Sequence, residues 1–313
     1  MIKVSVLLPV YNAASTLKES INSVIEQTFS DWELIVINDG SIDNTEEIIK
    51  SYSDSRIKYV KNETNKGLIY TLNRGISLAK GKYIARMDAD DICYFERFEK
   101  QVAFMDNNPD VIICGTQIEY FGTKSSNYKK LIFPLKDMQL KEMLATSTCF
   151  AHPSVMIKKS VLDDSGILYN MNYKNAEDYG LWVDLASYGK YANLKEVLLR
   201  YRVSDTQISQ PSNPQTIKSV LACRKKYLLT YLDEILVQSL FNNPINISIL
   251  KVVKQQTSNK KILESCYLSL ENYNLSSILY YIGSFDAFRL GILPFVRFMK
   301  RCLKGKSPIY YKL

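Results

Sequence analysis

The first half of the chain alternates continuous apolar runs with amphipathic segments. The run VSVLLPV is typical of a strand that is buried on both faces of a parallel sheet. Runs of this kind predict strands at 4–10, 33–39, 56–60 and 83–88. Helices are predicted after Thr16, after Asn44 and from Leu68 to about Lys80. This β-α-β-α-β-α-β order predicts an α/β fold with an open, mainly parallel sheet and right-handed crossovers.

The predicted helices carry start and stop signals. Thr16 and Glu19 have the spacing of a capping box, in which both side chains accept hydrogen bonds from the backbone of the first turn. Asn44 and Glu47 mark the start of the second helix with the same spacing. The third helix is expected to stop at Gly81, because glycine commonly ends helices.

The pattern is less regular after residue 90. A helix is predicted at 94–107 and a strand at 111–116, and mixed patterns continue to about residue 205. The stretch QPSNPQ at 210–215 has the composition of a linker, and nearly all that follows is helical in pattern. We therefore predict an α/β domain at 1–210 and a helical C-terminal region at 211–313.

Composition and charge narrow the function classes. The 313 residues are 46% hydrophobic and 23% charged, as in an ordinary globular protein with room for an enzyme core. A formal net charge of +8 suits nucleic acid, anionic lipid or phosphorylated substrates, and the sign alone does not choose among them. The six scattered cysteines are expected to be reduced, which indicates a cytoplasmic protein. No apolar run approaches the ~20 residues of a membrane span.

Polar residues gather where the predicted strands end, which is the ligand-binding edge of an open α/β sheet. The first strand ends at Pro9 and Tyr11, the second at Asp39, and the fourth at Asp88 and Asp90. Neither a G-x-G-x-x-G motif nor a P-loop occurs in the chain. The phosphates of a bound nucleotide would therefore need another source of neutralisation.

Asp88 and Asp90 are the candidates for that source. Side chains two residues apart in an extended segment point to the same side, so both carboxylates could reach one hard divalent cation. That cation, Mn²⁺ or Mg²⁺, would bridge a diphosphate and stabilise it as a leaving group. The alternative is an acidic turn that only caps the helix predicted at 94–107. The two residues alone leave both interpretations open.

Three further positions are candidates for chemistry. Asp178, which follows Glu177 at the start of a predicted helix, could act as a base toward an attacking hydroxyl or could only complement the helix dipole. His152 is the only histidine, which excludes mechanisms that need two, and a lone histidine is more often structural than a ligand. Arg200 and Arg202 share one face of a predicted strand, where they suit either a diphosphate or a solvated edge.

Taken together, these segments resemble a family two glycosyltransferase of the GT-A fold. The resemblance covers residues 4–209, about two-thirds of the chain. It depends on five sets of segments in the family's order, which are SVLLPVYN, QTFSDWELIVINDGSIDNT, NKGL with LNRGISLAKGKYIARMDADD, HPSVMIKKS, and AEDYGLWVDLA with LLRYRVSDTQIS. Each is weak alone, and their common order makes the resemblance specific.

The resemblance implies an inverting, metal-dependent transfer of a sugar from a UDP-sugar to a saccharide or lipid-linked acceptor, in capsule, O-antigen or exopolysaccharide biosynthesis. It implies no nucleic acid partner. Pro9, Tyr11 and Asp39 would hold the base, with Asp39 accepting a hydrogen bond from the uracil ring and Tyr11 packing on it. Arg74 would lie near the nucleotide.

The remaining implied roles concern the diphosphate and the reaction. Asp88 would contact the ribose, and Asp90 would bind Mn²⁺ or Mg²⁺. Asp178 would be the catalytic base. His152 and Arg202 would lie near the diphosphate or the acceptor.

The chain departs from the family pattern at two motifs. Many relatives have a histidine two residues after the arginine that corresponds to Arg202, where this chain has Ser204. The Q-x-x-R-W motif and the membrane spans of processive synthases are absent from the sequence, so one sugar per encounter is expected. Two other hypotheses are a catalytically silent scaffold that keeps the nucleotide-sugar site, and a nucleotidyltransferase, which would need a glycine-rich loop near the first strand.

Residues 295–304 predict a basic amphipathic helix. Phe298 and Met299 lie on its apolar face, and Arg297, Lys300 and Arg301 lie on the other. Such a helix can lie on an anionic membrane surface, which would make the protein peripheral on the inner face of the cell membrane. The alternative is that the apolar face packs on the catalytic domain.

Overall fold

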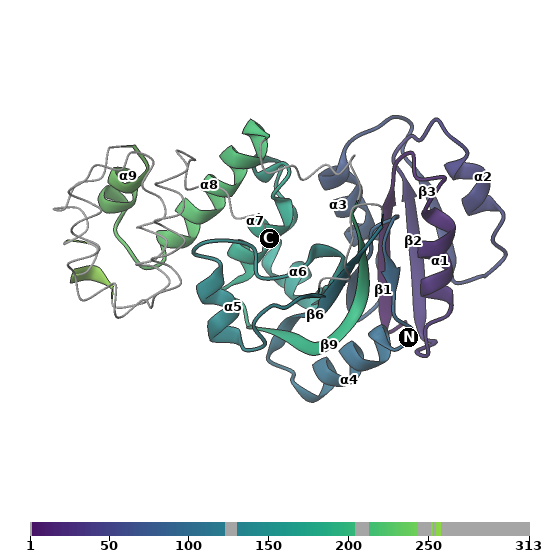
Figure 1. Ribbon diagram of the computed structural model, residues 1–313, viewed down its shortest axis with the longest axis horizontal. Helices are drawn as coiled ribbons and strands as arrows, with labels where there is room; N and C mark the ends of the chain where they lie inside the picture. Colours follow the sequence, from purple (N-terminus) through teal and green to yellow (C-terminus); the bar gives the residue numbers. More distant parts are fainter. Residues whose placement is uncertain (1, 123–129, 204–212, 243–251, 253–254, 258–313) are drawn as a thin grey trace. The chain divides into compact units, whose positions relative to one another are not determined.

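The computed structural model describes residues 2–122, 130–203, 213–242, 252 and 255–257 (Figure 1). The chain forms two compact units. The first unit comprises Met1–Leu140, Cys149–Met171 and Asp184–Ile208. The second unit comprises Lys141–Thr148, Asn172–Val183 and Ser209–Leu313. The functional division into domains at 1–210 and 211–313 stays a prediction.

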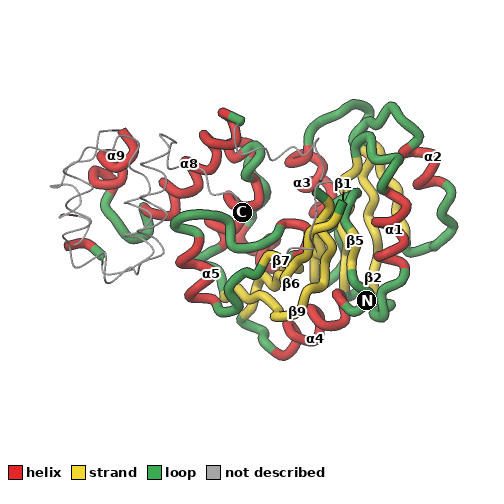
Figure 2. The backbone as a smooth tube through the Cα atoms, viewed as in Figure 1, coloured by secondary structure: helices red, strands yellow, loops and turns green. Residues whose placement is uncertain are grey.

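The first unit is built on one mixed sheet, which has nine strands within the described residues (Figure 2). The strands are β1 Val4–Val10, β2 Trp32–Asn38, β3 Ile57–Lys61, β4 Tyr83–Arg86, β5 Ile92–Cys93, β6 Val111–Phe121, β7 Lys130–Leu131, β8 Met156–Lys158 and β9 Lys190–Arg202. Their order across the sheet is β3-β2-β1-β4-β8-β6-β9-β5, and β7 pairs with β6.

Four of these strands form the parallel block that the sequence predicts. β3, β2, β1 and β4 are parallel neighbours, with Val4 of β1 opposite both Trp32 and Tyr83. Every residue of β1 and β2 is buried, which explains their continuous apolar runs. β8 pairs antiparallel with β4 and β6, and β6 is parallel to β9. The predicted α/β class with an open sheet is confirmed, with antiparallel strands joined to the parallel block.

Helices flank this sheet and continue the chain into the second unit. The α-helices are α1 Leu17–Ile25, α2 Thr45–Lys50, α3 Leu68–Leu78, α4 Arg97–Asn107, α5 Asp137–Met143, α6 Lys159–Ser165, α7 Glu177–Leu185, α8 Pro214–Leu228 and α9 Glu234–Asn242, with short 3₁₀ turns at η1 His152–Ser154 and η2 Met171–Tyr173. The helix α3 lies close on β1 and β2 at Gly75, where an added Cβ would come within 2.8 Å of Ile37 and 3.1 Å of Leu7. Close packing of this kind fixes α3 against the block.

The predicted capping box at Thr16 and Glu19 is wrong. The side chain of Thr16 makes no capping bond to α1, because its hydroxyl donates to the carbonyl of Ala89 at 2.9 Å. Glu19 forms an ion pair with Arg202 instead of capping the helix. The helix α2 does begin after Asn44, as predicted, although the side chain of Asn44 makes no capping bond. Tertiary partners have replaced the local bonds at α1, and they attach the start of that helix to the loop that follows β4.

We expect Gly40→Ala to destabilise the first unit more than Gly166→Ala. Both glycines have left-handed backbones, with φ of +73° and +66°, and for alanine this costs about 1–2 kcal/mol. At Gly40 the new Cβ would also lie 2.7 Å from the backbone carbon of Thr64, whereas no heavy atom lies within 4 Å at Gly166. Overpacking adds about 1–3 kcal/mol. Urea unfolding of the two variants measures the difference, and equal losses would contradict the packing argument.

Candidate active site

A turn at Asp88–Asp91, here called the acidic turn, follows the carboxyl end of β4. β4 ends at Arg86, and the backbone N–H of Asp91 donates to the carbonyl of Asp88 at 3.4 Å. The spacing of Asp88 and Asp90 suggested that both lie on one side of an extended strand. The structure shows that they lie in a turn instead. The turn nevertheless brings together carboxylate oxygens of Asp88, Asp90 and Asp91, all within 4.8 Å of one another.

The acidic turn does not cap the following helix. β5 lies between the turn and α4, which begins at Arg97 with Glu96 at its cap position. The turn is instead bound to α1, where Thr16 donates to the carbonyl of Ala89 and Ser20 donates to the carbonyl of Asp91 at 2.7 Å. The capping interpretation of the acidic residues is therefore excluded by the structure.

Arg202, the last residue of β9, holds the turn from the other side. Its backbone N–H donates to the Oδ1 of Asp91 at 2.8 Å, and its Nε donates to the carbonyl of Asp90 at 2.7 Å. Its Nη2 pairs with Glu19, and the guanidinium lies over the ring of Phe121 at 4.4 Å. The contacts on these nitrogens fix the backbone of the turn, a structural role in addition to the predicted one near a diphosphate.

The charges of the turn fit a divalent cation. Burial, and then the negative charge of Asp88, raises the pKa of Asp90 to about 6. Burial, followed by the charges of Asp88 and Asp90, also raises the pKa of Asp91, whose Oδ2 is buried without a hydrogen-bond partner among the described residues. Crowded carboxylates with an unused oxygen are the hard ligands that Mn²⁺ and Mg²⁺ prefer.

A second polar cluster lies at the carboxyl end of β2. Asp39 is buried, and its carboxylate accepts hydrogen bonds from the Nδ2 of Asn62 at 2.6 Å and from the backbone N–H groups of Lys66 and Gly67 at 2.9 and 2.8 Å. Arg74 donates to the carboxamide oxygen of Asn62. The structure thus joins the two predicted residues, Asp39 and Arg74, through Asn62, and fixes the loop after β3.

Pro9 and Tyr11 lie at the end of the neighbouring strand. Pro9 is buried in β1 opposite Ile37, and Tyr11 follows the strand with 49% of its surface exposed. The backbone N–H of Asp39 donates to the carbonyl of Val10 at 2.8 Å, so the two strand ends are adjacent. An exposed ring beside a polar cluster is available for packing on a planar ligand.

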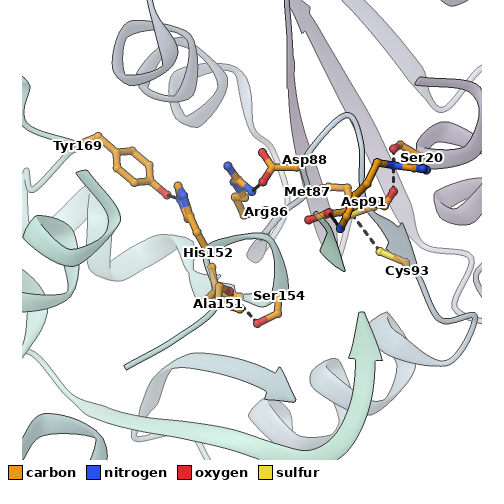
Figure 3. A network of polar contacts seen from close by, with 12 residues as sticks. Ser20, Arg86, Met87, Asp88, Asp91, Cys93, Ala151, His152, Ser154 and Tyr169 are labelled. Atoms are coloured by element: carbon orange, nitrogen blue, oxygen red, sulfur yellow. Dashed lines mark hydrogen bonds and ion pairs between the residues drawn. The ribbon is translucent and has the colours of Figure 1, made fainter. Parts of the chain in front are cut away.

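His152 is a buried, neutral side chain at the start of η1. Its Nε2 lies 2.8 Å from the hydroxyl of Tyr169. Burial, and then the positive charge of Arg86, holds its pKa well below 6.5. Figure 3 shows Arg86 between His152 and Asp88, so the histidine and the acidic turn lie on opposite sides of that guanidinium.

We expect the His152→Gln variant to lose less stability than the wild type when the pH falls into the mildly acidic range. Below about pH 6.5 the unfolded chain binds a proton at His152 that the folded chain does not, so the free energy of unfolding falls by up to about 1.4 kcal/mol per pH unit. His152 is the only histidine, so the wild-type curve minus the variant curve isolates this group. Urea unfolding from about pH 7 to about pH 5 measures it, and parallel curves would contradict the expectation.

Asp178 belongs to the second unit. It lies with Glu177 in the first turn of α7, and the hydroxyl of Thr148 is 3.5 Å from its Oδ2. The helix itself forms as predicted, with Leu181 and Trp182 buried. The role of Asp178 as a base stays a prediction, as do the ligand contacts of the other candidate residues.

Sequence reasoning missed two residues of these clusters, Arg86 and Asn62, and gave Asp91 no role of its own. Arg86 and Asp91 flank the predicted pair of carboxylates, and Asn62 connects Asp39 to Arg74. Asp91 was visible as the third acid of the run DADD. No sequence signal marks Asn62, because its role depends on two long-range contacts.

Comparison with known proteins agrees with the resemblance. The model of the family described as glycosyl transferase family 2 matches residues 5–166. An uncharacterised glycosyltransferase of Haemophilus influenzae is 34% identical over 89% of this chain and 90% of its own. The chain therefore belongs to glycosyl transferase family 2.

Two relatives from Escherichia coli carry more specific names. The O-antigen biosynthesis glycosyltransferase WbnJ is 34% identical over 70% of this chain and 84% of its own. The UDP-Glc:alpha-D-GlcNAc-diphosphoundecaprenol beta-1,3-glucosyltransferase WfgD is 31% identical over 66% of this chain and 79% of its own.

Solved structures share the fold. TarS of Staphylococcus aureus in complex with UDP has a TM-score of 0.63 at 18% identity, covering 99% of this chain and 93% of that chain. The mannosyltransferase PcManGT of Pyrobaculum calidifontis, in complex with GDP-Man and Mn²⁺, has a TM-score of 0.55 at 14% identity, covering 98% and 81%. The predicted GT-A fold is confirmed. Among the described residues, no helix combines the length and the apolar character that crossing a membrane requires.

Proposed function

We propose that this protein transfers a sugar, with inversion, from a UDP-sugar to a saccharide or lipid-linked acceptor. The product would be a surface polysaccharide such as a capsule, an O-antigen or an exopolysaccharide. The observation that carries the proposal is the acidic turn, where three carboxylates lie within 4.8 Å at the carboxyl edge of the parallel block. The names of WbnJ and WfgD and the UDP bound by TarS support this donor and this pathway.

The acidic turn is the part of the site that would meet the diphosphate. A bound Mn²⁺ or Mg²⁺ would supply Lewis-acid stabilisation of the diphosphate leaving group. Asp90 would hold that ion, and Asp88 would accept a hydrogen bond from the ribose. Arg202 would keep the turn in place through its bonds to the Oδ1 of Asp91 and to the backbone carbonyl of Asp90.

The cluster at the ends of β1 and β2 would hold the base. Tyr11 is exposed beside Asp39, as packing on a uracil ring requires. Three donors already orient the carboxylate of Asp39, so little reorganisation would accompany a further hydrogen bond from the ring. Arg74 would act beside the nucleotide while it holds Asn62.

Asp178 would remove the proton from the acceptor hydroxyl as that oxygen attacks the sugar carbon. A carboxylate is suited to this role when it is held in one orientation, and Thr148 lies beside it. His152, neutral and held by Tyr169, would take part through hydrogen bonds near the diphosphate or the acceptor.

A lipid-linked acceptor would place the reaction at the inner face of the cell membrane, where we propose that the cytoplasmic protein acts as a peripheral enzyme. The basic helix predicted at 295–304 would meet an anionic membrane surface. That segment lies outside the described residues.

The test is a hydrolysis and transfer assay of the purified chain against a panel of UDP-sugars, with Mn²⁺ or with a chelator. We expect one donor to be hydrolysed slowly and transferred in the presence of an acceptor extract, and the chelator to abolish both reactions. UDP binding without turnover of any donor would instead support the silent scaffold. Turnover that persists in the chelator would contradict the metal-dependent mechanism.

A further inference from the structure

Arg86 places a permanent positive charge inside the sheet, directly before the acidic turn. The residue is only 4% exposed. Its backbone N–H donates to the carbonyl of Val155 at 3.0 Å, and its own carbonyl accepts from the Nη2 of Arg97 at 2.9 Å. Neighbours on both sides therefore fix the backbone of Arg86.

The guanidinium of Arg86 is incompletely hydrogen-bonded. It forms an ion pair with the carboxylate of Asp88, which is partly exposed. Its Nε is buried and has no hydrogen-bond partner among the described residues. On the side away from Asp88 lies His152, which is neutral and supplies no compensating charge (Figure 3).

A buried guanidinium with an unused donor is unfavourable unless neighbouring negative charges stabilise it. The acidic turn supplies such charges, since the buried Asp91 and the half-buried Asp90 lie beside Asp88. Arg202, the other cation at the turn, is itself paired with Glu19. Arg86 therefore stands where its charge opposes the mutual repulsion of the three carboxylates.

We propose that Arg86 is a positioning residue that acts as the internal counter-cation of the acidic turn. It holds Asp88 in place, allows three carboxylates to stay together without a metal, and lowers the affinity of the turn for a divalent cation. The cation is then retained well only when the negative diphosphate of a donor adds to the site. This inference rests on the proposed function only for the choice of Mn²⁺ and a nucleotide diphosphate.

The test is calorimetric titration of the full chain with MnCl₂ in the absence of nucleotide. Removing the charge in Arg86→Met should tighten Mn²⁺ binding by about tenfold, because a nearby like charge no longer opposes the ion. Arg86→Lys keeps the charge and should bind Mn²⁺ within about twofold of the wild type. A purely structural role of Arg86 would leave the affinity unchanged or weaken it.

The matched control is Lys82→Met. Lys82 precedes the same strand at its other end, where it pairs with Asp106 at 2.7 Å. Its removal should leave the Mn²⁺ affinity unchanged.

A second background keeps the test decisive if Arg86→Met does not fold. The double variant Arg86→Met/Asp88→Asn removes both members of the ion pair, a change that buried pairs often tolerate. It should bind Mn²⁺ about tenfold more tightly than Asp88→Asn alone, because the same charge is removed.

The results of the titration separate the role of Arg86 from the proposed function. Equal or weaker Mn²⁺ binding in the charge-removing variants, or equal tightening in Lys82→Met, would overturn the role of Arg86 and leave the proposed function standing. No Mn²⁺ binding by any of the proteins would overturn the metal site and this inference together. Failure to find a sugar donor would affect the proposed function alone, since the titration contains no donor.

Discussion

Asp90→Asn is expected to abolish metal-dependent sugar transfer while making the metal-free protein more stable. The loss of one charged ligand removes several kcal/mol of leaving-group stabilisation, so kcat/KM should fall on the order of a thousandfold. The free energy of unfolding of the metal-free variant should instead be higher than that of the wild type. The pKa of Asp90 in the folded state is raised to about 6. The free energy of unfolding therefore falls as pH rises through about 6, and at pH 7 the ionised carboxylate destabilises the fold. Turnover assays and urea unfolding without metal measure the two effects.

The control for this variant is Asp106→Asn. Asp106 is an acid of α4 that lies near the amino end of β4, where it pairs with Lys3 and Lys82 at 2.7 Å. The Asp106→Asn variant should lose some stability and keep its activity. An Asp90→Asn protein that is both inactive and less stable at neutral pH would show that the residue serves the fold, and the assignment of the metal site would then fail.

Asp178→Asn is expected to lower kcat by about 10²–10⁴-fold with little change in donor binding, as for the loss of a general base. The substitution keeps the shape of the side chain and removes its ability to accept a proton. Mn²⁺ affinity and the affinity for UDP should both stay near the wild-type values, because the role concerns the acceptor hydroxyl. Steady-state kinetics and calorimetry on the same preparation measure this separation.

Glu177→Gln is the matched control for that experiment. Both acids lie in the first turn of α7, where an acidic side chain stabilises a helix by about 0.3–1 kcal/mol through the helix dipole. The two variants should therefore lose similar stability, and only Asp178→Asn should lose turnover. A parallel fall in activity in both would support the alternative that these acids serve only the helix.

The parallel block was predictable because its signals are local. β1 and β2 are buried throughout and mostly apolar, since both faces are covered, and a run such as VSVLLPV indicates that environment directly. The acid-rich end of the YIARMDADD segment was also visible. The sequence could place Asp88 and Asp90 at a strand end because open α/β sheets bind ligands there.

The remaining features depend on contacts that no local pattern records. Thr16 has the sequence context of a helix cap, and only the presence of Ala89 beside it redirects its hydroxyl. Arg86 looks like an ordinary charged residue near a strand end until its burial is known. The structural role of Arg202 could not be predicted, because the alternation of side chains along β9 gives the face of the strand and not the partners on that face.

The bonds that hold the acidic turn also set the order in which the site can be completed during synthesis. The backbone bond from Arg202 to Asp91 joins residues 111 positions apart, and the pair with Glu19 spans 183 positions. A nascent chain that has reached β4 can form the parallel block, whereas the turn gains its second support only after β9 has emerged. Contacts of such long range form late and slowly. Immature chains on the ribosome therefore lack a fully supported acidic turn, and β9 adds the contacts that complete it.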